Sequence, residues 1–218
     1  MKYATRLPAL FLPCLLSSLC LLMLSAAAAQ ASGSWRIQGS EALATEKSVT
    51  WKQDGGSYAF LLPTLNLQLV FKKLVFNGGK LQSEGKGIAE FKFTEGKVYT
   101  IKGELEELPC IVGDLTFSAP TNLFLHNGKT YNSLKVETIT TYSSGTGCPL
   151  APKNTVVGTI VLEGNFEEEA VEHLFKVAPT ALFPELTIKF GTNPLEVDGS
   201  WIGLLTGSHA GLKWSGIG

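Results

Sequence analysis

The sequence lacks the short motifs that mark most catalytic and cofactor sites. It has no phosphate-binding loop, no glycine-rich dinucleotide motif after a strand, no EF-hand loop and no G-x-S-x-G nucleophile elbow. Its three histidines, His126, His173 and His209, are far apart and do not have the spacing of zinc ligands. We therefore predict no catalytic residue, no metal site and no cofactor.

Charge is scarce and nearly balanced. Lysine and arginine number 18 and the acidic residues 19, which together make 17% of the chain. Lys2 and Arg6 are the only charges in the first 31 residues. The remaining chain has 16 basic and 19 acidic side chains, a net charge of −3. Nucleic-acid binding needs a concentrated excess of basic residues, so we exclude nucleic acid as the partner.

The N-terminus has the pattern of an export signal. Lys2 and Arg6 form a positive head, residues 7–24 are almost entirely apolar, and residues 25–31 are nearly all alanine. This order of a charged head, an apolar centre and a small-residue exit is the pattern that signal peptidase recognises. We therefore predict a secretion signal over residues 1–31 and a single exported domain over residues 32–218.

The cleavage site has two candidates. Ala29-Gln30-Ala31 fits the A-x-A rule and gives Ser32 as the mature N-terminus, whereas a cut after Ala29 gives Gln30. An uncleaved anchor is the alternative, because 18 apolar positions are close to the minimum of about 17 for a membrane span. The prolines in this stretch and its alanine-rich exit favour cleavage, which leaves no transmembrane span.

Two cysteines, Cys110 and Cys148, remain after the signal is removed. An even number of cysteines in an oxidising compartment predicts a disulfide, because neither residue has a second cysteine or a histidine at ligand spacing. In the chain-entropy model, closing this loop stabilises the fold by about 3 to 4 kcal/mol. The glycine-, serine- and proline-rich loop 143–154 around Cys148 is then expected to be a crossover that the disulfide holds down.

The remaining chain alternates short apolar segments with glycine turns. The 23 glycines all follow residue 31, and period-two alternation of apolar and polar residues dominates. Predicted strands cover residues 48–53, 58–62, 65–71, 74–76, 88–93, 98–101, 123–126, 134–142, 156–162, 186–190, 195–197, 200–205 and 212–214. Predicted tight turns lie at Asp54-Gly55-Gly56, Asn77-Gly78-Gly79, Thr94-Glu95-Gly96, Asn127-Gly128 and Asp198-Gly199. The pattern predicts an all-β fold, an antiparallel sandwich or partly closed barrel of about ten or more short strands.

One segment has a helical pattern instead. Val171, Leu174, Phe175 and Ala178 fall at i, i+3, i+4 and i+7, which places them on one face of a helix. Asn165 is a suitable N-cap, and a proline follows Ala178. We therefore predict one short amphipathic helix, from Asn165 to Ala178, over a sheet edge or a barrel mouth.

Tryptophans are the best candidates for ligand contacts. Trp201 and Trp214 are flanked by glycine and serine near the C-terminal end. An exposed indole stacks on sugar rings or lines a lipid pocket, because its face gives a large contact area. The alternative is that both rings pack in the core, which is the more common position of tryptophan in an alternating strand.

Acidic clusters leave a hydrolase open as an alternative. Glu104, Glu106 and Glu107 form one cluster and residues 167–169 form another. A glycosidase needs two carboxyl groups about 5 to 10 Å apart. Such clusters are usually solvated surface, so a secreted hydrolase such as a glycosidase ranks last among the functions considered.

These observations favour an exported non-catalytic β domain, a binding or structural component of the cell envelope or extracellular space. An envelope component, a carbohydrate or an apolar ligand are the partners considered. The first alternative is a barrel that carries an apolar ligand, with residues 165–178 as its lid. A closed cavity lined by Phe60, Leu67, Phe91 or Phe93 would favour the carrier, and an interior filled by those side chains would favour the scaffold.

Native mass spectrometry of the secreted protein tests the export prediction. We expect the mass of a chain that begins at Ser32, reduced by two hydrogens because Cys110 and Cys148 are joined. An intact translation product in the cytosol, with both thiols free, would contradict it.

Overall fold

The computed structural model describes residues 33–39, 42–101 and 106–218. The predicted signal segment, both candidate cleavage sites and Glu104 lie outside these residues. Within them, no helix has the length and apolar character needed to cross a bilayer.

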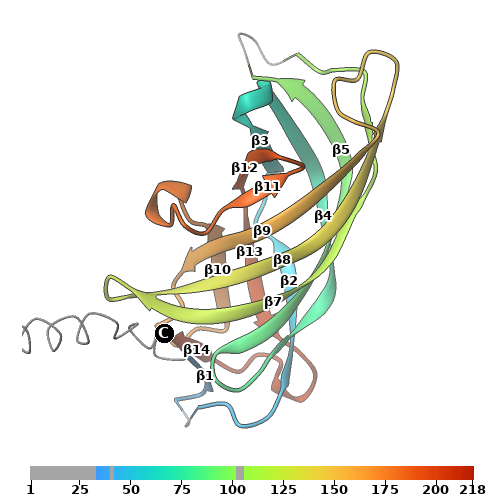
Figure 1. Ribbon diagram of the computed structural model, residues 1–218. Coiled ribbons are helices and arrows are strands. Elements are labelled where there is room, and N and C mark those ends of the chain that lie inside the picture. Colours follow the sequence, from blue (N-terminus) through green and yellow to red (C-terminus); the bar gives the residue numbers. More distant parts are fainter. Residues whose placement is uncertain (1–32, 40–41, 102–105) are drawn as a thin grey trace, which may run out of the picture. The chain divides into compact units, whose positions relative to one another are not determined.

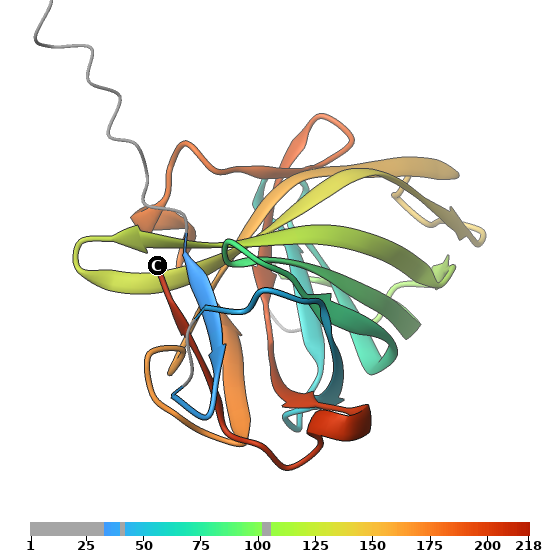
Figure 2. The same ribbon diagram turned by 90° about the horizontal axis from the view of Figure 1, so that it is seen from below.

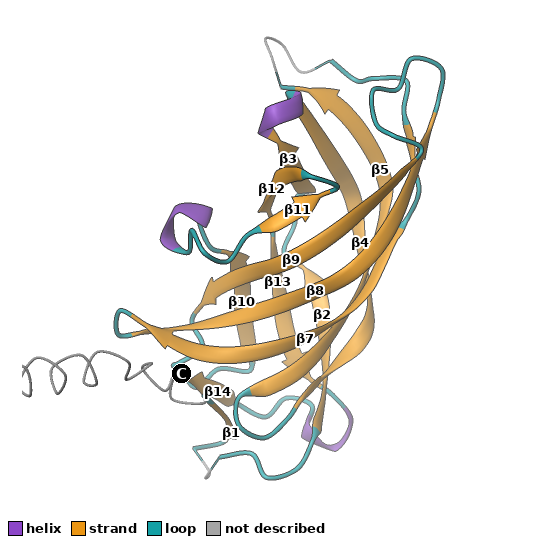
Figure 3. Ribbon diagram, in the orientation of Figure 1, coloured by secondary structure: helices purple, strands orange, loops and turns teal. Residues whose placement is uncertain are grey.

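The described residues form an all-β structure, as predicted (Figures 1 and 3). Three short 3-10 turns, η1 (Pro63–Leu65), η2 (Thr180–Leu182) and η3 (Gly207–His209), are the helical elements among them. The strands are β1 (Ser34–Ile37), β2 (Lys47–Gln53), β3 (Tyr58–Leu62), β4 (Leu67–Leu81), β5 (Lys86–Thr100), β6 (Ile111–Val112), β7 (Leu115–His126), β8 (Lys129–Ser144), β9 (Lys153–Gly164), β10 (Glu172–Val177), β11 (Ile188–Phe190), β12 (Asn193–Asp198), β13 (Ser200–Leu205) and β14 (Trp214–Ile217).

The pairings close the main sheet on itself as an antiparallel barrel. Four long strands, β4, β5, β8 and β9, run through the whole wall and pair with different short strands at each end. At one end the order is β4-β2-β13-β10-β9-β8-β7-β5, which returns to β4. At the other end the order is β4-β3-β12-β11-β9-β8-β6-β5, which again returns to β4. The barrel is therefore closed at both ends of its wall by strand pairing.

Two predicted reversals are wrong because the chain continues straight through them. Asn77-Gly78-Gly79 lies inside β4, where the register with β5 shifts between Phe76 and Gly78. Glu95 of Thr94-Glu95-Gly96 lies inside β5 with a φ of 58°. Glycines and positive φ angles occur in bulges as well as in turns, so a bulge and a turn have similar local sequence patterns. The β4–β5 turn lies instead at residues 82–86, where the Gln82 amide donates to the Lys86 carbonyl at 2.8 Å.

The Asn127-Gly128 hairpin is confirmed, with φ angles of 50° and 75° between β7 and β8. The Asp54–Gly56 turn joins strands that do not pair with each other. The same holds for the Asp198-Gly199 turn, so the expectation of a hairpin between residues 195–197 and 200–205 is wrong. Each of these two turns carries the chain from one end of the barrel wall to the other, since β2 and β13 belong to one end and β3 and β12 to the other.

The predicted helix over residues 165–178 is wrong, because its C-terminal half is strand β10. His173, Phe175 and Val177 alternate inward with exposed fractions of 0%, 1% and 9%. β9 and β13 each offer a strand edge to this segment, and pairing with both overrides the helical pattern. Asn165 does not cap a helix, because its side-chain oxygen accepts the Leu174 amide at 3.1 Å.

Aromatic rings fill the barrel interior. Phe93 contacts Tyr58, Phe60 and Phe71 at centroid distances of 5.3 to 5.6 Å. Phe91 lies 5.1 Å from Phe117 and 5.4 Å from Trp201. Inward positions from strands all around the wall thus meet in one packed layer.

A separate ribbon of β1 and β14 lies against one end of the barrel (Figure 2). Its inward side chains are Trp35 and Trp214, which are 1% and 0% exposed and lie 5.5 Å apart. The Trp35 indole N–H donates to the Lys86 carbonyl at 2.9 Å, next to the β4–β5 turn. The ribbon therefore joins both ends of the described chain to the barrel.

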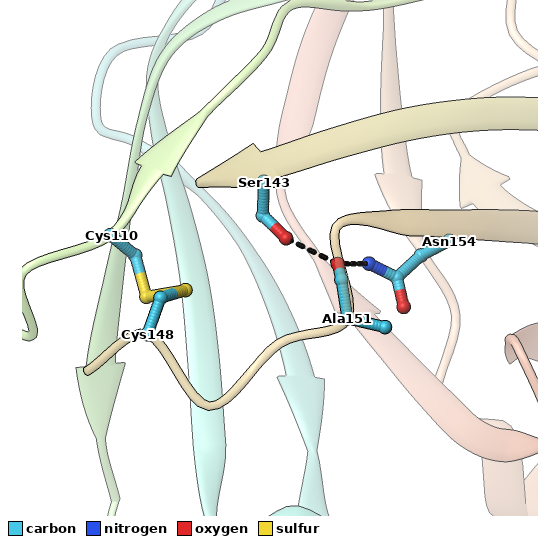
Figure 4. The surroundings of a disulfide bond; sticks show 5 residues. All are labelled: Cys110, Ser143, Cys148, Ala151 and Asn154. Carbon is cyan, nitrogen blue, oxygen red and sulfur yellow. Dashed lines mark hydrogen bonds between the residues drawn. A yellow bond between two sulfur atoms is a disulfide. The ribbon is translucent and has the colours of Figure 1, made fainter. Parts of the chain in front are cut away.

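The disulfide between Cys110 and Cys148 is present (Figure 4). It links the residue before β6 to the β8–β9 connection, where Ser143 and Asn154 both donate to the Ala151 carbonyl at 2.6 Å. This connection joins neighbouring antiparallel strands, so it is a hairpin loop and not the crossover that we predicted.

Replacement of Gly216 by alanine should loosen the ribbon. A Cβ at Gly216 would lie 2.6 Å from the Trp35 ring and 2.8 Å from Leu123, and neither side chain has space to move. We expect Gly216→Ala to lower the free energy of unfolding by about 1 to 3 kcal/mol in urea titrations. Gly113→Ala is the matched control, because its Cβ would meet neighbours at ordinary distances of 3.4 Å or more. Equal stability of the two variants would contradict this account of the ribbon.

Candidate functional site

Neither predicted tryptophan offers an exposed face. Trp201 is 4% exposed and lies within 6.5 Å of Tyr58 in the barrel interior. Trp214 is fully buried in the ribbon, and its indole N–H donates to the Val171 carbonyl at 3.1 Å. Both rings are core side chains, the alternative that sequence reasoning left open.

The interior leaves almost no free volume beside these rings. The space between Trp51, Trp201, Phe91 and Phe175 is about 10 Å³, the size of a single water molecule. Phe60, Leu67 and Phe93 are at most 5% exposed and belong to the same packed cluster. This packing leaves no room for a ligand beside these residues inside the barrel.

The acidic clusters are surface ion pairs or structural anchors. Glu107 accepts hydrogen bonds from Lys97 at 2.6 and 2.8 Å, and this contact lowers the pKa of Glu107. Glu167 accepts the Thr130 amide and hydroxyl at 2.9 and 2.7 Å. A glycosidase acid needs a raised pKa, and the Lys97 contact shifts Glu107 in the opposite direction. Within the described ranges, no three His, Cys, Asp or Glu side chains are grouped to hold a metal ion.

His173 is buried, with an exposed fraction of 0%. Its Nε2 lies 2.6 Å from the Trp214 carbonyl, and its ring centroid is 4.3 Å from that of Trp214. A carbonyl only accepts, so Nε2 carries the proton and Nδ1 is the bare nitrogen. Burial lowers the pKa of His173, while backbone carbonyls and the Glu168 charge oppose that shift. A neutral His173 thus fastens the ribbon to β10.

A wide concavity lies over the bulge in β4, and we call it the bulge groove. Its volume is about 540 Å³. Four strands and the loop after β13 supply its lining: Ser48, Val49, Thr50, Phe76, Asn77, Gly78, Gly79, Lys80, Ile88, Glu90, Ser118 and Thr206. The bulge bends β4 at this point, which explains why a hollow forms on an otherwise regular wall.

The bulge groove mixes hydrogen-bonding groups of both kinds with apolar surface. Hydroxyl groups come from the serines and threonines, an amide from Asn77, and partly buried apolar contact from Phe76 and Ile88. Its lining has one charge of each sign, Lys80 and Glu90, and Lys80 also forms an ion pair at 2.8 Å with Glu46, which does not line the groove. The hydrogen bond to Glu46 raises the pKa of Lys80, and the pKa of Glu46 is lowered.

Sequence reasoning missed the bulge groove because it read Asn77-Gly78-Gly79 as a turn. The signal was present as an Asn-Gly-Gly triplet inside a long apolar alternation, but only pairing with β5 distinguishes a bulge from a reversal.

Comparisons with known proteins find no matching family model, no matching curated protein and no matching solved structure.

His173 should make the stability of the fold depend on pH. Its folded-state pKa is below the ordinary value of 6.5, so the unfolded chain binds a proton more readily. The stabilising contribution is therefore complete above about pH 6.5 and is lost as pH falls, at most about 1.4 kcal/mol per pH unit. Urea titrations between pH 7.5 and 5 measure this loss.

The control for this experiment is a pair of histidine variants. His173→Gln keeps an N–H donor for the Trp214 carbonyl but does not titrate, so the pH dependence should become flatter. His209→Gln changes a half-buried histidine in η3 and is the matched control, with the wild-type profile expected. If both variants keep the wild-type profile, His173 does not set it.

Proposed function

We propose that this protein is exported and acts as a non-catalytic β-barrel domain that binds a carbohydrate of the cell envelope or extracellular space. The predicted signal over residues 1–31 and the disulfide of Cys110 and Cys148 support export to an oxidising compartment. The barrel supplies a rigid wall, and the ligand binds on the outside of that wall.

The composition of the bulge groove is the observation that carries this proposal. Neutral sugars present hydroxyl groups that donate and accept, together with apolar C–H faces. The groove offers matching hydroxyl and amide groups beside Phe76 and Ile88, without an excess of either charge. Its volume of about 540 Å³ lies within the usual range for ligand sites.

Rigidity of the surrounding wall supports the same proposal. Most groove side chains belong to strands of the main sheet, β2, β4, β5 and β7, and Thr206 belongs to the loop after β13. Beneath them, Trp51 and Phe91 pack at a centroid distance of 6.4 Å in the filled interior. A preformed site of this kind loses little conformational entropy when it binds a ligand.

Affinity electrophoresis in gels containing soluble neutral polysaccharides (β-glucan, xylan, mannan or dextran) tests the proposal. We expect at least one of them to retard the secreted protein. Ser118→Arg places a long side chain in the groove and should weaken that binding at least about tenfold, which equals ~1.4 kcal/mol. Asn77→Ala, which removes the amide, should weaken it in the same direction.

Thr116→Arg is the matched control, because Thr116 is exposed on the same strand and does not line the groove. Its binding should equal that of the wild type. Migration unchanged by every polysaccharide, or equal loss in both arginine variants, would overturn the proposal.

A further inference from the structure

The barrel wall has a seam where the chain leaves it between β10 and β11. β10 pairs with β9 at Val177 and Leu162, and β11 resumes this pairing at Ile188 and Gly158. Residues 178–187 leave the sheet between these points as a strap that carries the turn η2 (Figure 3). The wall at this point therefore consists of side chains instead of a continuous backbone ladder.

The strap is held in place by packing against β7 and β8 and by hydrogen bonds to β9. Phe183 is 2% exposed and packs 4.9 Å from Tyr131 and 5.7 Å from Phe124. Two backbone hydrogen bonds fix the ends of the strap to β9. The Ala178 amide donates to the Val161 carbonyl at 2.9 Å, and the Thr159 amide donates to the Thr187 carbonyl at 3.1 Å. Because these contacts fix the strap, its residues form one wall of a defined cavity.

Two connected spaces lie along the seam. The inner one, about 20 Å³, has a lining that is apolar except for two threonines: Thr159, Ile160, Val161, Val177, Ala178, Pro179, Thr180, Phe183, Leu186, Ile188 and Val197. The outer one is a groove of about 350 Å³ that shares five of these residues, Val177, Ala178, Pro179, Thr180 and Val197. Together they make a mainly apolar slot that is narrow at one end and wider at the other.

Charges of both signs stand at the open end. Lys176 lines one bank of the outer groove, and Glu196 and Asp198 line the other. None of the three belongs to an ion pair formed within the described part of the chain. A head group with a full charge would be attracted by one bank and repelled by the other, whereas an uncharged polar head can hydrogen-bond to both.

We propose that this seam binds a single aliphatic chain with an uncharged polar head. The methyl end enters the narrow space between Ile160 and Phe183, the chain lies along Val177 and Val197, and the head remains at the charged mouth. The site goes beyond the proposed carbohydrate binding, because it shares no lining residue with the bulge groove.

Isothermal titration of the secreted protein with 1-hexanol, 1-octanol and 1-decanol tests the proposal. Burial of each methylene contributes about 0.8 kcal/mol, so affinity should rise about 15-fold for every two carbons. Octyl sulfate and octyltrimethylammonium should bind no more tightly than 1-octanol. Absence of binding, or affinity independent of chain length, would overturn the proposal.

Two pairs of variants locate the site. Ala181→Trp fills the outer groove and should weaken octanol binding at least tenfold, whereas Leu182→Trp, the next residue and 45% exposed, does not line either space and should bind normally. Val197→Asn makes the slot polar, and its control Val157→Asn changes an exposed position outside it. The second pair decides the question if a tryptophan variant does not fold.

Ser118→Arg separates this proposal from the carbohydrate site. Octanol binding should be unchanged in that variant, because Ser118 lines only the bulge groove. Equal loss of octanol binding in each variant and its control would show a non-specific effect and would overturn the assignment to the seam.

Discussion

The fold depends on four long strands that pair as β4–β5 and β8–β9 along most of their length, while the neighbours on their other sides change. β4 pairs first with β3 and then with β2, and β9 pairs first with β11 and then with β10. An unpaired buried backbone group costs about as much as a lost hydrogen bond, so the stretch between two successive neighbours needs a local solution. Bulges, short connections and the strap of residues 178–187 are the local solutions to this requirement.

The fold class and the disulfide could be predicted from sequence because both rest on local or counting signals. Alternation of apolar and polar residues with a period of two indicates a strand with one buried and one exposed face. Two cysteines after an export signal can form only one intramolecular disulfide. The Asn127-Gly128 hairpin was predictable for the same reason, since the turn itself requires positive φ at both positions.

The features that escaped prediction depend on partners distant in sequence. Residues 171–178 fit a helical pattern only when His173 is treated as an exposed polar residue. Its neutral ring is instead buried against Trp214, so buried residues recur at every second position of this segment. Asn77-Gly78-Gly79 becomes a bulge because β5 continues beside it for several residues. The candidate sites were hidden for the same reason, because each forms where the neighbours of a strand change.

Both proposed sites lie on the outside of the wall because side chains fill the interior beside the aromatic rings. Rings such as Phe93 and Trp201 occupy the volume that an open barrel would give to a ligand, and their burial stabilises the closed wall. A regular paired strand presents a smooth surface, so concavities arise where the regular pairing is interrupted. The hollow over the bulge in β4 has a mostly polar lining that includes Ser48, Thr50 and Ser118, whereas the seam is lined mainly by apolar side chains such as Ile160 and Val177. The two interruptions therefore differ in the chemistry of the ligand that each fits.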